Sequence, residues 1–432
     1  MEYITDMSER HVCNVFLIEF LIQALEISLT CLKKLYPKER RVRLRVHPGL
    51  ERGPIYLDYN ATTPIDPVVV EAMLPYLSEH FGNPSSSHSY GYRAHQAVDS
   101  ARAQVAQLLG CSAKEITFTG GGSESDNLAI RGIALAYQDK GDHIITQITE
   151  HPGVLKTCHA LERLHGFRVT YLPVDRSGRV STEEVEAAID DKTVLITIMH
   201  ANNEIGTLQP ITEIAKIARK HGVLLHTDAA QSVGKISVRV QELGVDLLTV
   251  AGHKLYAPKG IGALYSRNDL NLEPVIYGGG QESGRRAGTE SVANIVGLGT
   301  ACLLAQESLS ESQVRLRSMR DKLQRLIEEF IPVDVHLNGH ETERLPNTLN
   351  ISVDGVIGEE VLEITPEIAS STGSACHEGS TDPSPVLMAM GLSRERALGA
   401  MRLTLGRWST EDEIERAARL LAKSIDSLRR KL

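Results

Sequence analysis

The chain has 432 residues, of which 42% are hydrophobic and 23% charged, values typical of a globular rather than a disordered protein. Its formal net charge of -9 argues against a dedicated nucleic-acid surface, so we expect no nucleic-acid partner. Six cysteines without a CxxC pair form neither a small disulfide scaffold nor a zinc or redox motif of that kind. We therefore expect no metal site and a reducing, cytoplasmic location.

Residues 1–52 form an N-terminal extension whose pattern differs from the rest of the chain. Its apolar stretch, VCNVFLIEFLIQALEISLTCLKKL, is interrupted by polar side chains, so no run reaches the roughly 18 residues of a membrane span. Acidic residues occupy the start, where a signal peptide is basic. A solvated tether, an amphipathic surface helix and a mistaken start codon all fit this extension. We expect no membrane span and assign the extension no function.

From residue 55 onward, short β-branched runs alternate with segments of helical spacing. This alternation indicates an α/β fold with a mainly parallel sheet covered by helices on both faces. The predicted strands cover 115–119, 143–148, 194–200, 223–228 and 247–252. The predicted helices between them cover 125–139, 152–166 and 211–222.

A change of pattern near residue 309 predicts a second, smaller α+β domain. A long charged helix, a strand-like LPNTLNISV and a C-terminal helix follow one another there, over 311–331, 345–353 and 410–432. We expect a large domain over 66–308, and a small domain formed by 53–65 together with 309–432.

Three glycines and a serine follow the first predicted strand in FTGGGSESDNLAI, which places Ser123 at the head of a helix. Glycines let backbone N–H groups approach an anion, and the helix N-terminus adds a positive partial charge. Gly122 and Ser123 therefore have the form of a phosphate seat, although the stretch is neither GxGxxG nor a Walker loop. A tight turn with an N-cap serine explains the same residues.

Asp228 and Lys254 each follow a predicted buried strand. A carboxylate at the C-terminal end of a parallel strand lies where such folds bind ligands, although Asp228 could also cap the next helix. Most lysines are surface charges, but Lys254 lies in a loop of small residues, beside His253. Among apolar strands the pKa of a lysine falls, and the amine becomes able to form a Schiff base.

These three elements together predict pyridoxal 5'-phosphate as the cofactor. Pyridoxal phosphate needs an amine for its aldehyde, an acid for its ring nitrogen and a seat for its phosphate. Lys254, Asp228 and the Gly122–Ser123 pair offer these groups in that order.

Beyond these elements, the chain from about residue 55 to its C-terminus resembles cysteine desulfurases of the NifS/IscS type, fold-type-I pyridoxal phosphate enzymes of the aminotransferase class V family. The matching stretches are YLDYNATTP (56–64), FGNPSS (81–86), SESDNLAI (123–130), TEHPGVL (149–155), MHANNEIG (199–206), TDAAQSVGK (227–235), GHKLYAPKGIGALY (252–265), GGGQESGRRAGTES (278–291), GSAC (373–376) and RLTLGRWST (402–410). The resemblance implies a large domain with a mainly parallel seven-stranded sheet and a smaller α+β C-terminal domain.

The resemblance also implies a role for individual residues around the cofactor. Lys254 would be the Schiff-base lysine, Asp228 the partner of the ring nitrogen, and Gln231 the partner of the ring hydroxyl. His151 would stack on the ring and assist proton transfer, as a catalytic residue beside Lys254. The phosphate would be held by Gly122, Ser123 and His253, and by Thr289 from a neighbouring subunit, which implies a homodimer with shared sites.

Asn203 would contact the cofactor and, with Arg402, would clamp the carboxylate of the substrate, for which the planar fork of arginine is suited. Read without the family, Asn203 is a turn residue and Arg402 a surface charge. One position departs from the family: Ala251 stands where a serine or threonine commonly binds the phosphate. The missing hydroxyl contact costs about 1 kcal/mol of cofactor binding or somewhat more.

The stretch STGSACHEGSTDPSPVL places Cys376 among small and polar residues, where no apolar pattern would bury it. The resemblance implies that Cys376 is the catalytic thiol, which takes sulfur from L-cysteine as a persulfide and leaves L-alanine. A loop of this length implies transfer to a sulfur acceptor, an iron–sulfur scaffold or a thiolation partner. The other cysteines fit structural positions.

Two other functions remain open at this stage. A selenocysteine lyase shares the cofactor and most motifs, and the sequence does not separate it from a desulfurase. A catalytically silent scaffold subunit would lack a use for Lys254 and Cys376, both of which are intact.

Overall fold

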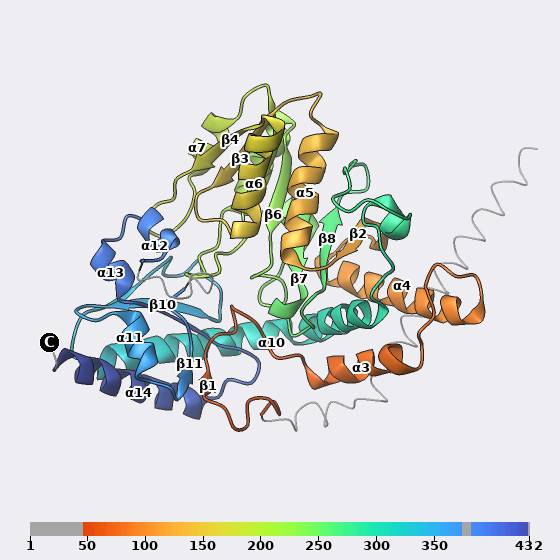
Figure 1. The fold of residues 1–432 in the computed structure, drawn as a ribbon. Helices are drawn as coiled ribbons and strands as arrows, with labels where there is room; N and C mark the ends of the chain where they lie inside the picture. Colours follow the sequence, from red (N-terminus) through yellow and green to blue (C-terminus); the bar gives the residue numbers. More distant parts are fainter. Residues whose placement is uncertain (1–45, 374–381, 431–432) are drawn as a thin grey trace, which may run out of the picture. The chain divides into compact units, whose positions relative to one another are not determined.

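The computed structural model describes residues 46–373 and 382–430 of the chain (Figure 1). A seven-stranded sheet with the order β2-β8-β7-β6-β5-β3-β4 lies at its centre, and only β8 runs antiparallel to its neighbours. The strands are β2 Ile116–Thr119, β3 His143–Gln147, β4 Arg168–Leu172, β5 Thr193–Thr197, β6 Leu224–Asp228, β7 Leu247–Ala251 and β8 Gly262–Ser266. The expected mainly parallel seven-stranded sheet is therefore confirmed.

Two strands, β4 and β8, were not predicted from the pattern of apolar residues. β4 lies at an edge of the sheet and is mostly part-exposed, so it lacks a buried apolar run. β8 begins at Gly262, the last residue of the glycine-rich stretch KGIG, so its first residues do not show a strand pattern. The five predicted strands are confirmed within a few residues at each end.

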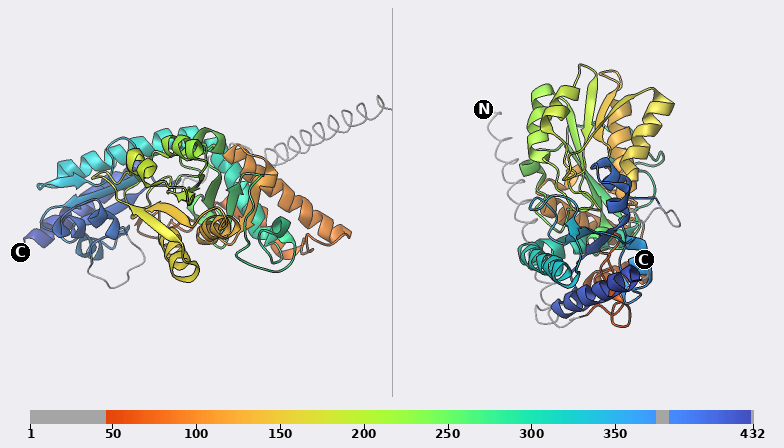
Figure 2. Two further views of the ribbon diagram at one scale, coloured as in Figure 1. Left: turned by 90° about the horizontal axis from the view of Figure 1, so that it is seen from above. Right: turned by 90° about the vertical axis from the view of Figure 1, so that its left-hand side faces the viewer.

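Side chains of the central strands alternate between two apolar cores, one on each face of the sheet. Ile144 and Leu247 pack into the core beneath α5 and α6, whereas the following residues, Ile145 and Leu248, pack into the opposite core. Helices α5 and α6 lie side by side over one face (Figures 1 and 2). The helices of this part are α3 Pro67–Ser78, α4 Ser89–Leu109, α5 Gly122–Ala136, α6 Pro152–His165, α7 Thr182–Ala188, α8 Ile211–His221, α9 Val240–Leu243 and α10 Val292–Phe330, with 3-10 turns η1 Ala113–Glu115, η2 Gly252–Lys254 and η3 Gln281–Gly284.

Helix α10 is longer than the sequence pattern predicts, because it begins at Val292 rather than near residue 311. Its N-terminal half packs on α3 and α4, and its C-terminal half packs on α14 (Figure 1). By length and composition this helix could cross a membrane, but 67% of its most apolar 18-residue window is buried inside the protein, as in a core helix.

A separate apolar core lies between the C-terminal half of α10, α14 and two small sheets. Ile55 and Leu57 join this core, so the chain just after residue 52 packs with the C-terminal elements. These elements are β1 Ile55–Tyr56, β9 Val335–Leu337, β10 Thr348–Val353, β11 Ile368–Ala369, β12 Ala400–Thr404, α11 Gly358–Glu363, α12 Pro385–Ala389, α13 Arg394–Leu398 and α14 Glu411–Arg429.

Candidate active site

The predicted cofactor residues gather beyond the C-terminal ends of the parallel strands. Asp228 is the last residue of β6, and Lys254 ends the 3-10 turn η2 that follows β7. His151 caps the N-terminus of α6, shortly after β3. The ends of β3, β6 and β7 thus bring these three side chains into mutual electrostatic contact, although β5 lies between β3 and β6. This is the edge of an open α/β sheet at which ligands bind.

Asp228 is a buried acid facing two potential cations. Its side chain is 6% exposed, and its Oδ1 accepts a hydrogen bond from the Ala230 N–H at 2.8 Å. Burial raises the pKa of Asp228, while His151 and Lys254 act in the opposite direction. A protonated ring nitrogen placed beside this carboxyl would add a further opposing charge and favour the carboxylate.

His151 is poised as a neutral imidazole in this setting. Its Nδ1 accepts a hydrogen bond from the Gly153 N–H at 3.0 Å, so the proton of the neutral ring lies on Nε2. Burial lowers the pKa of His151, with Asp228 opposing and Lys254 reinforcing the change. The ring can therefore pack on an aromatic ligand and exchange a proton through Nε2.

Two backbone oxygens hold the amine of Lys254. Its Nζ donates to the carbonyl oxygens of Asn60 at 2.6 Å and Ala61 at 2.7 Å. The segment after β1 therefore forms one wall of the site. The adjacent His253 contacts Thr62 through Nδ1 at 3.1 Å, and burial, followed by the charge of Lys254, lowers the pKa of His253 to about 4.

The predicted phosphate seat begins at the N-terminus of α5, which starts at Gly122. The preceding Gly121 has φ 147°, a conformation that favours glycine, and no side chain caps the helix. A Cβ added to Gly121 would meet nothing within 4 Å, so the space in front of the helix is open. The uncapped N–H groups of the first turn are suited to an anion such as a phosphate.

Ala251 packs against this seat. A Cβ added to Gly122 would lie 3.2 Å from the Ala251 Cβ, tighter than most real contacts. The end of β7 and the start of α5 therefore approach closely because both positions carry small residues. Because Ala251 has no hydroxyl to bind the cofactor phosphate, weaker cofactor binding stays a prediction.

Arg402 lies within the site rather than at the surface, since its residue is only 2% exposed. It comes from β12 of the C-terminal part, and its Nη1 donates to the Asn203 carbonyl at 3.2 Å and to the Gly373 carbonyl at 2.7 Å. Its Nη2 donates to Asp58 at 2.8 Å. Among the described residues, the buried Nε has no hydrogen-bond partner. Arg402 therefore contacts Asn203, as expected for a shared substrate site, and its Nε remains available to donate to a carboxylate.

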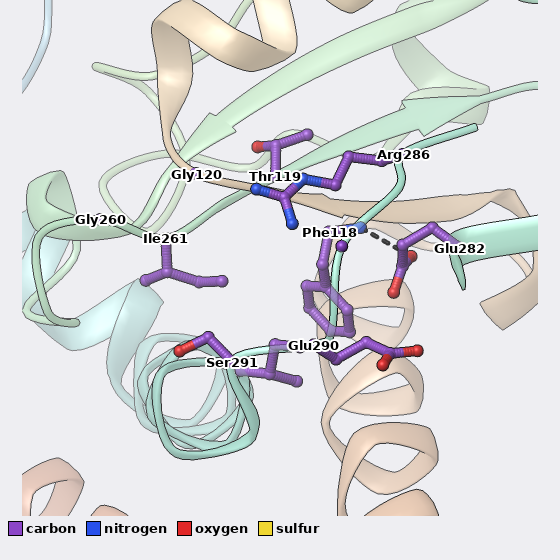
Figure 3. Close-up of a pocket in the computed structure, with 11 residues that line it drawn as sticks. Phe118, Thr119, Gly120, Gly260, Ile261, Glu282, Arg286, Glu290 and Ser291 are labelled. Carbon is purple, nitrogen blue, oxygen red and sulfur yellow. Dashed lines mark hydrogen bonds between the residues drawn. The ribbon is translucent and has the colours of Figure 1, made fainter. Parts of the chain in front are cut away.

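Thr289 lies apart from these residues in a loop that borders a second hollow. It is exposed, and its neighbours Gly288 and Glu290 line a pocket together with Gly120. Figure 3 shows Arg286 and Glu282 on one side of this pocket and Glu290 and Ser291 on another. The expected contact of Thr289 with the phosphate of a neighbouring subunit stays a prediction.

The catalytic thiol predicted at Cys376 lies outside the described residues. Three other cysteines are described: Cys158 and Cys302 are buried and Cys111 is part-buried. Burial raises the pKa of each of these thiols to about 12, which keeps them protonated and unreactive. Their predicted structural role fits these surroundings.

Two residues at the centre of the site received no role from the sequence. Asn60, 1% exposed, connects Lys254 to strands β10 and β12 through its hydrogen bonds to Thr348 and Thr404. Lys235 donates to Asn60 and to Gln231. Both residues lie inside motifs that match the family, YLDYNATTP and TDAAQSVGK, and that position was the only available signal.

The site fits pyridoxal phosphate on its own chemistry. An amine, a buried acid and an open helix N-terminus occur at one edge of the sheet. A buried arginine with an unpaired Nε adds a place for a substrate carboxylate. The donor set therefore suits a cofactor with an aldehyde, a ring nitrogen and a phosphate.

Comparison with known proteins agrees with this fit. Residues 55–417 match the aminotransferase class-V family. A cysteine desulfurase IscS from Dictyoglomus turgidum is 48% identical over 377 residues, 87% of this chain and 95% of that protein. Among solved structures, a NifS-like protein has a TM-score of 0.81 at 36% identity, covering 87% of this chain and 100% of its own. SspA in complex with cysteine has a TM-score of 0.73 at 42% identity, covering 81% and 98%. The chain therefore belongs to the class-V aminotransferase family of pyridoxal phosphate enzymes, among the cysteine desulfurases of the NifS/IscS type.

Proposed function

We propose that this protein is a cysteine desulfurase, which removes sulfur from L-cysteine, leaves L-alanine and collects the sulfur on Cys376. The observation that carries the proposal is that Arg402 meets Asn203 next to Asn60, whose carbonyl oxygen accepts a hydrogen bond from Lys254. A carboxylate site next to the cofactor amine fits an α-amino acid. The relatives named as cysteine desulfurases, and the neighbour in complex with cysteine, support this choice of amino acid.

Each group in the site has a task in this reaction. The N-terminus of α5, with Gly122, Ser123 and His253, would hold the phosphate, while Asp228 would face the ring nitrogen and Gln231 the ring hydroxyl. His151 would stack on the ring. When bound, pyridoxal phosphate supplies an aldehyde for the substrate amine and a ring that takes up negative charge from Cα.

The side chains of the protein carry the proton and the sulfur. Arg402 and Asn203 bind the carboxylate of cysteine and fix its orientation, and Lys254 Nζ takes the Cα proton. The Cys376 thiolate attacks the substrate sulfur, so an S–S bond forms as the Cβ–S bond breaks. The electron pair of the broken bond stays with the carbon skeleton, which leaves as L-alanine after protonation.

We further propose that the persulfide passes to an acceptor protein for iron–sulfur cluster assembly or thiolation, in the cytoplasm. A homodimer with shared sites is part of this proposal. Exposed Thr289 and an exposed, stacked pair of rings, Phe81 and Tyr90, support a surface that meets a second copy.

Mass analysis after incubation with L-cysteine tests the proposal. We expect one additional sulfur on the peptide that contains Cys376, together with L-alanine in solution. The Cys376→Ala variant should form neither at the parent rate, whereas Cys111→Ala should behave as the parent. Turnover of L-selenocysteine without turnover of L-cysteine would instead identify a selenocysteine lyase. Unchanged alanine and sulfide formation by Cys376→Ala would refute the persulfide mechanism.

A further inference from the structure

The side-chain amide of Gln231 is held by a contact on each of its two polar atoms. Gln231 is 5% exposed, in the turn after β6. Its Nε2 donates to the Asn60 carbonyl oxygen at 3.0 Å, and its Oε1 accepts from Lys235 Nζ at 2.8 Å. Turning the amide by 180° would place its oxygen against the Asn60 carbonyl and its N–H groups against an amine. These two contacts therefore select a single orientation.

Lys235 is itself fixed by the side chain of Asn60. Its Nζ donates to Asn60 Oδ1 at 3.2 Å, and that oxygen also accepts from Asn347 Nδ2 at 3.1 Å. The Nδ2 of Asn60 in turn donates to Thr348 Oγ1 at 2.9 Å. Because Asn60 is 1% exposed and its amide atoms are all used, it forms a rigid support for the Lys235 amine.

The charge state of Lys235 is compatible with this role. Burial lowers the pKa of Lys235 well below its usual range, and the charges of Lys254 and Arg402 lower it further. An uncharged amine keeps two N–H donors, enough for Gln231 and Asn60. Even beside a neutral amine, a turned Gln231 amide would still place its oxygen against the Asn60 carbonyl.

The Gln231 amide also lies beside the amine of the cofactor site. The Asn60 carbonyl that accepts from Gln231 Nε2 accepts from Lys254 Nζ as well, at 2.6 Å. Among the described residues, one N–H of Gln231 Nε2 is assigned to Asn60, which leaves the second for a ligand.

We propose that Lys235 is a positioning residue that fixes the Gln231 amide with its N–H, and not its oxygen, toward the ring oxygen of the cofactor. This inference rests on the proposed function, in which Gln231 contacts that oxygen. An N–H donor stabilises an ionised ring oxygen, whereas an amide oxygen would repel it. The i,i+4 spacing of the two residues lets one short turn deliver both the amide and the amine that orients it.

Cofactor binding to the cofactor-free protein tests this role without any turnover. The Lys235→Met variant keeps the length of the side chain and removes its donors. We expect the dissociation constant for pyridoxal phosphate to rise roughly tenfold, as for a lost hydrogen bond to a charged group. The visible absorption band of the bound cofactor should also shift. Lys235→Arg, which keeps donors, should restore most of the affinity. Lys220→Met, at an exposed lysine of α8, is the matched control and should bind as the parent does.

A double-variant cycle separates positioning from a general structural role. If Lys235 acts through Gln231, adding Lys235→Met to Gln231→Ala should weaken binding no further, since the oriented group is already absent. Additive losses, unchanged affinity in Lys235→Met, or a loss with an unshifted absorption band would each overturn the proposal. Because no L-cysteine is used, failure of the desulfurase assay would count against the proposed function alone.

Discussion

At the scale of a single residue, Arg402 shows how a binding group is prepared before its ligand arrives. Two backbone carbonyls and the carboxylate of Asp58 already fix the orientation of the guanidinium. This arrangement reduces the side-chain freedom that substrate binding would otherwise have to remove. The remaining Nε donor then determines where a carboxylate can bind.

Replacing Arg402 with lysine should therefore weaken substrate binding without removing the cofactor. A lysine presents a point charge and cannot reproduce the planar fork. We expect the KM for L-cysteine to rise by about tenfold or more, equivalent to at least ~1.4 kcal/mol, while the absorption of the bound cofactor is retained. Steady-state kinetics would measure this change.

A matched control for this prediction is Arg315→Lys. Arg315 also donates to several backbone carbonyls, those of Gly406, Arg407 and Ser409, but it lies on α10 and serves the loop before α14. This variant should keep the parent KM. An Arg402→Lys enzyme with the parent KM would contradict the assignment of Arg402 to the substrate carboxylate.

At the scale of an element, three parallel strands are joined by a buried hydrogen-bonded histidine. His226 on β6 contacts Thr197 on β5 through Nδ1 at 2.8 Å and Thr249 on β7 through Nε2 at 3.1 Å. Burial lowers the pKa of His226 to about 3, and that of nearby His200 to about 4. The sheet at β6 and the segment after β5 therefore each contain an imidazole that resists protonation in the folded state.

These histidines should make the folded protein sensitive to acid. Because their pKa values are lower in the folded than in the unfolded state, the unfolded state binds more protons below about pH 6.5. Their contribution to stability is complete above that pH and is lost as the pH falls toward 4 and 3. Urea unfolding at pH 7, 6 and 5 should show a decreasing free energy of unfolding.

The His226→Gln variant tests the origin of this decrease. Glutamine can still contact both threonines but does not titrate, so the decrease between pH 7 and 5 should be smaller than in the parent. His165→Gln, at an exposed position of α6, should leave the decrease unchanged. An identical pH dependence in His226→Gln and the parent would show that other groups are responsible.

The sequence patterns of the strands also explain which strands and which site residues could be predicted. Five strands were predicted because their short β-branched runs are buried, even in the edge strand β2, whereas the other edge strand, β4, is mostly part-exposed and carries no such run. Asp228 and Lys254 were found since each follows a buried strand directly. Asn60 was not assigned, because it contacts Gln231 and Lys235 across more than 170 residues of sequence, which no local pattern encodes. Lys235 lies only four residues from Gln231, but its support from Asn60 is equally distant in sequence.

At the scale of the molecule, the site depends on two parts joined by α10: the central sheet with the cores on its two faces, and the C-terminal part with its separate core. Lys254 and Asp228 belong to the part built on the central sheet, whereas Arg402 comes from the part built around α14. Asn60 contacts both, through Lys254 on one side and Thr404 on the other. The relative placement of cofactor and substrate groups thus follows from packing between these two parts, and a change at Asn60 should affect both.

Exposed apolar side chains on α3, on the loop after it and at the start of α4 favour association with a second copy of the chain. Leu74, Leu77, Phe81 and Tyr90 are each at least 52% exposed, and Phe81 stacks on Tyr90 with ring centroids 5.3 Å apart. Clustered exposed apolar residues of this kind mark protein interaction surfaces. A charge placed among them should therefore oppose association.

We expect the parent protein to elute with twice the 47.3 kDa mass of one chain, and Phe81→Glu to shift this mass toward that of the monomer. Burying an unpaired carboxylate in an interface costs several kcal/mol, so dissociation should occur at micromolar concentrations. Light scattering coupled to size exclusion would measure the mass.

Leu164→Glu is the matched control, since Leu164 is 65% exposed on α6, outside this surface. If cofactor affinity falls together with the dimer in Phe81→Glu but stays intact in Leu164→Glu, the neighbouring chain contributes to the phosphate seat, as expected for Thr289. A dimer that persists in Phe81→Glu would place the subunit interface elsewhere.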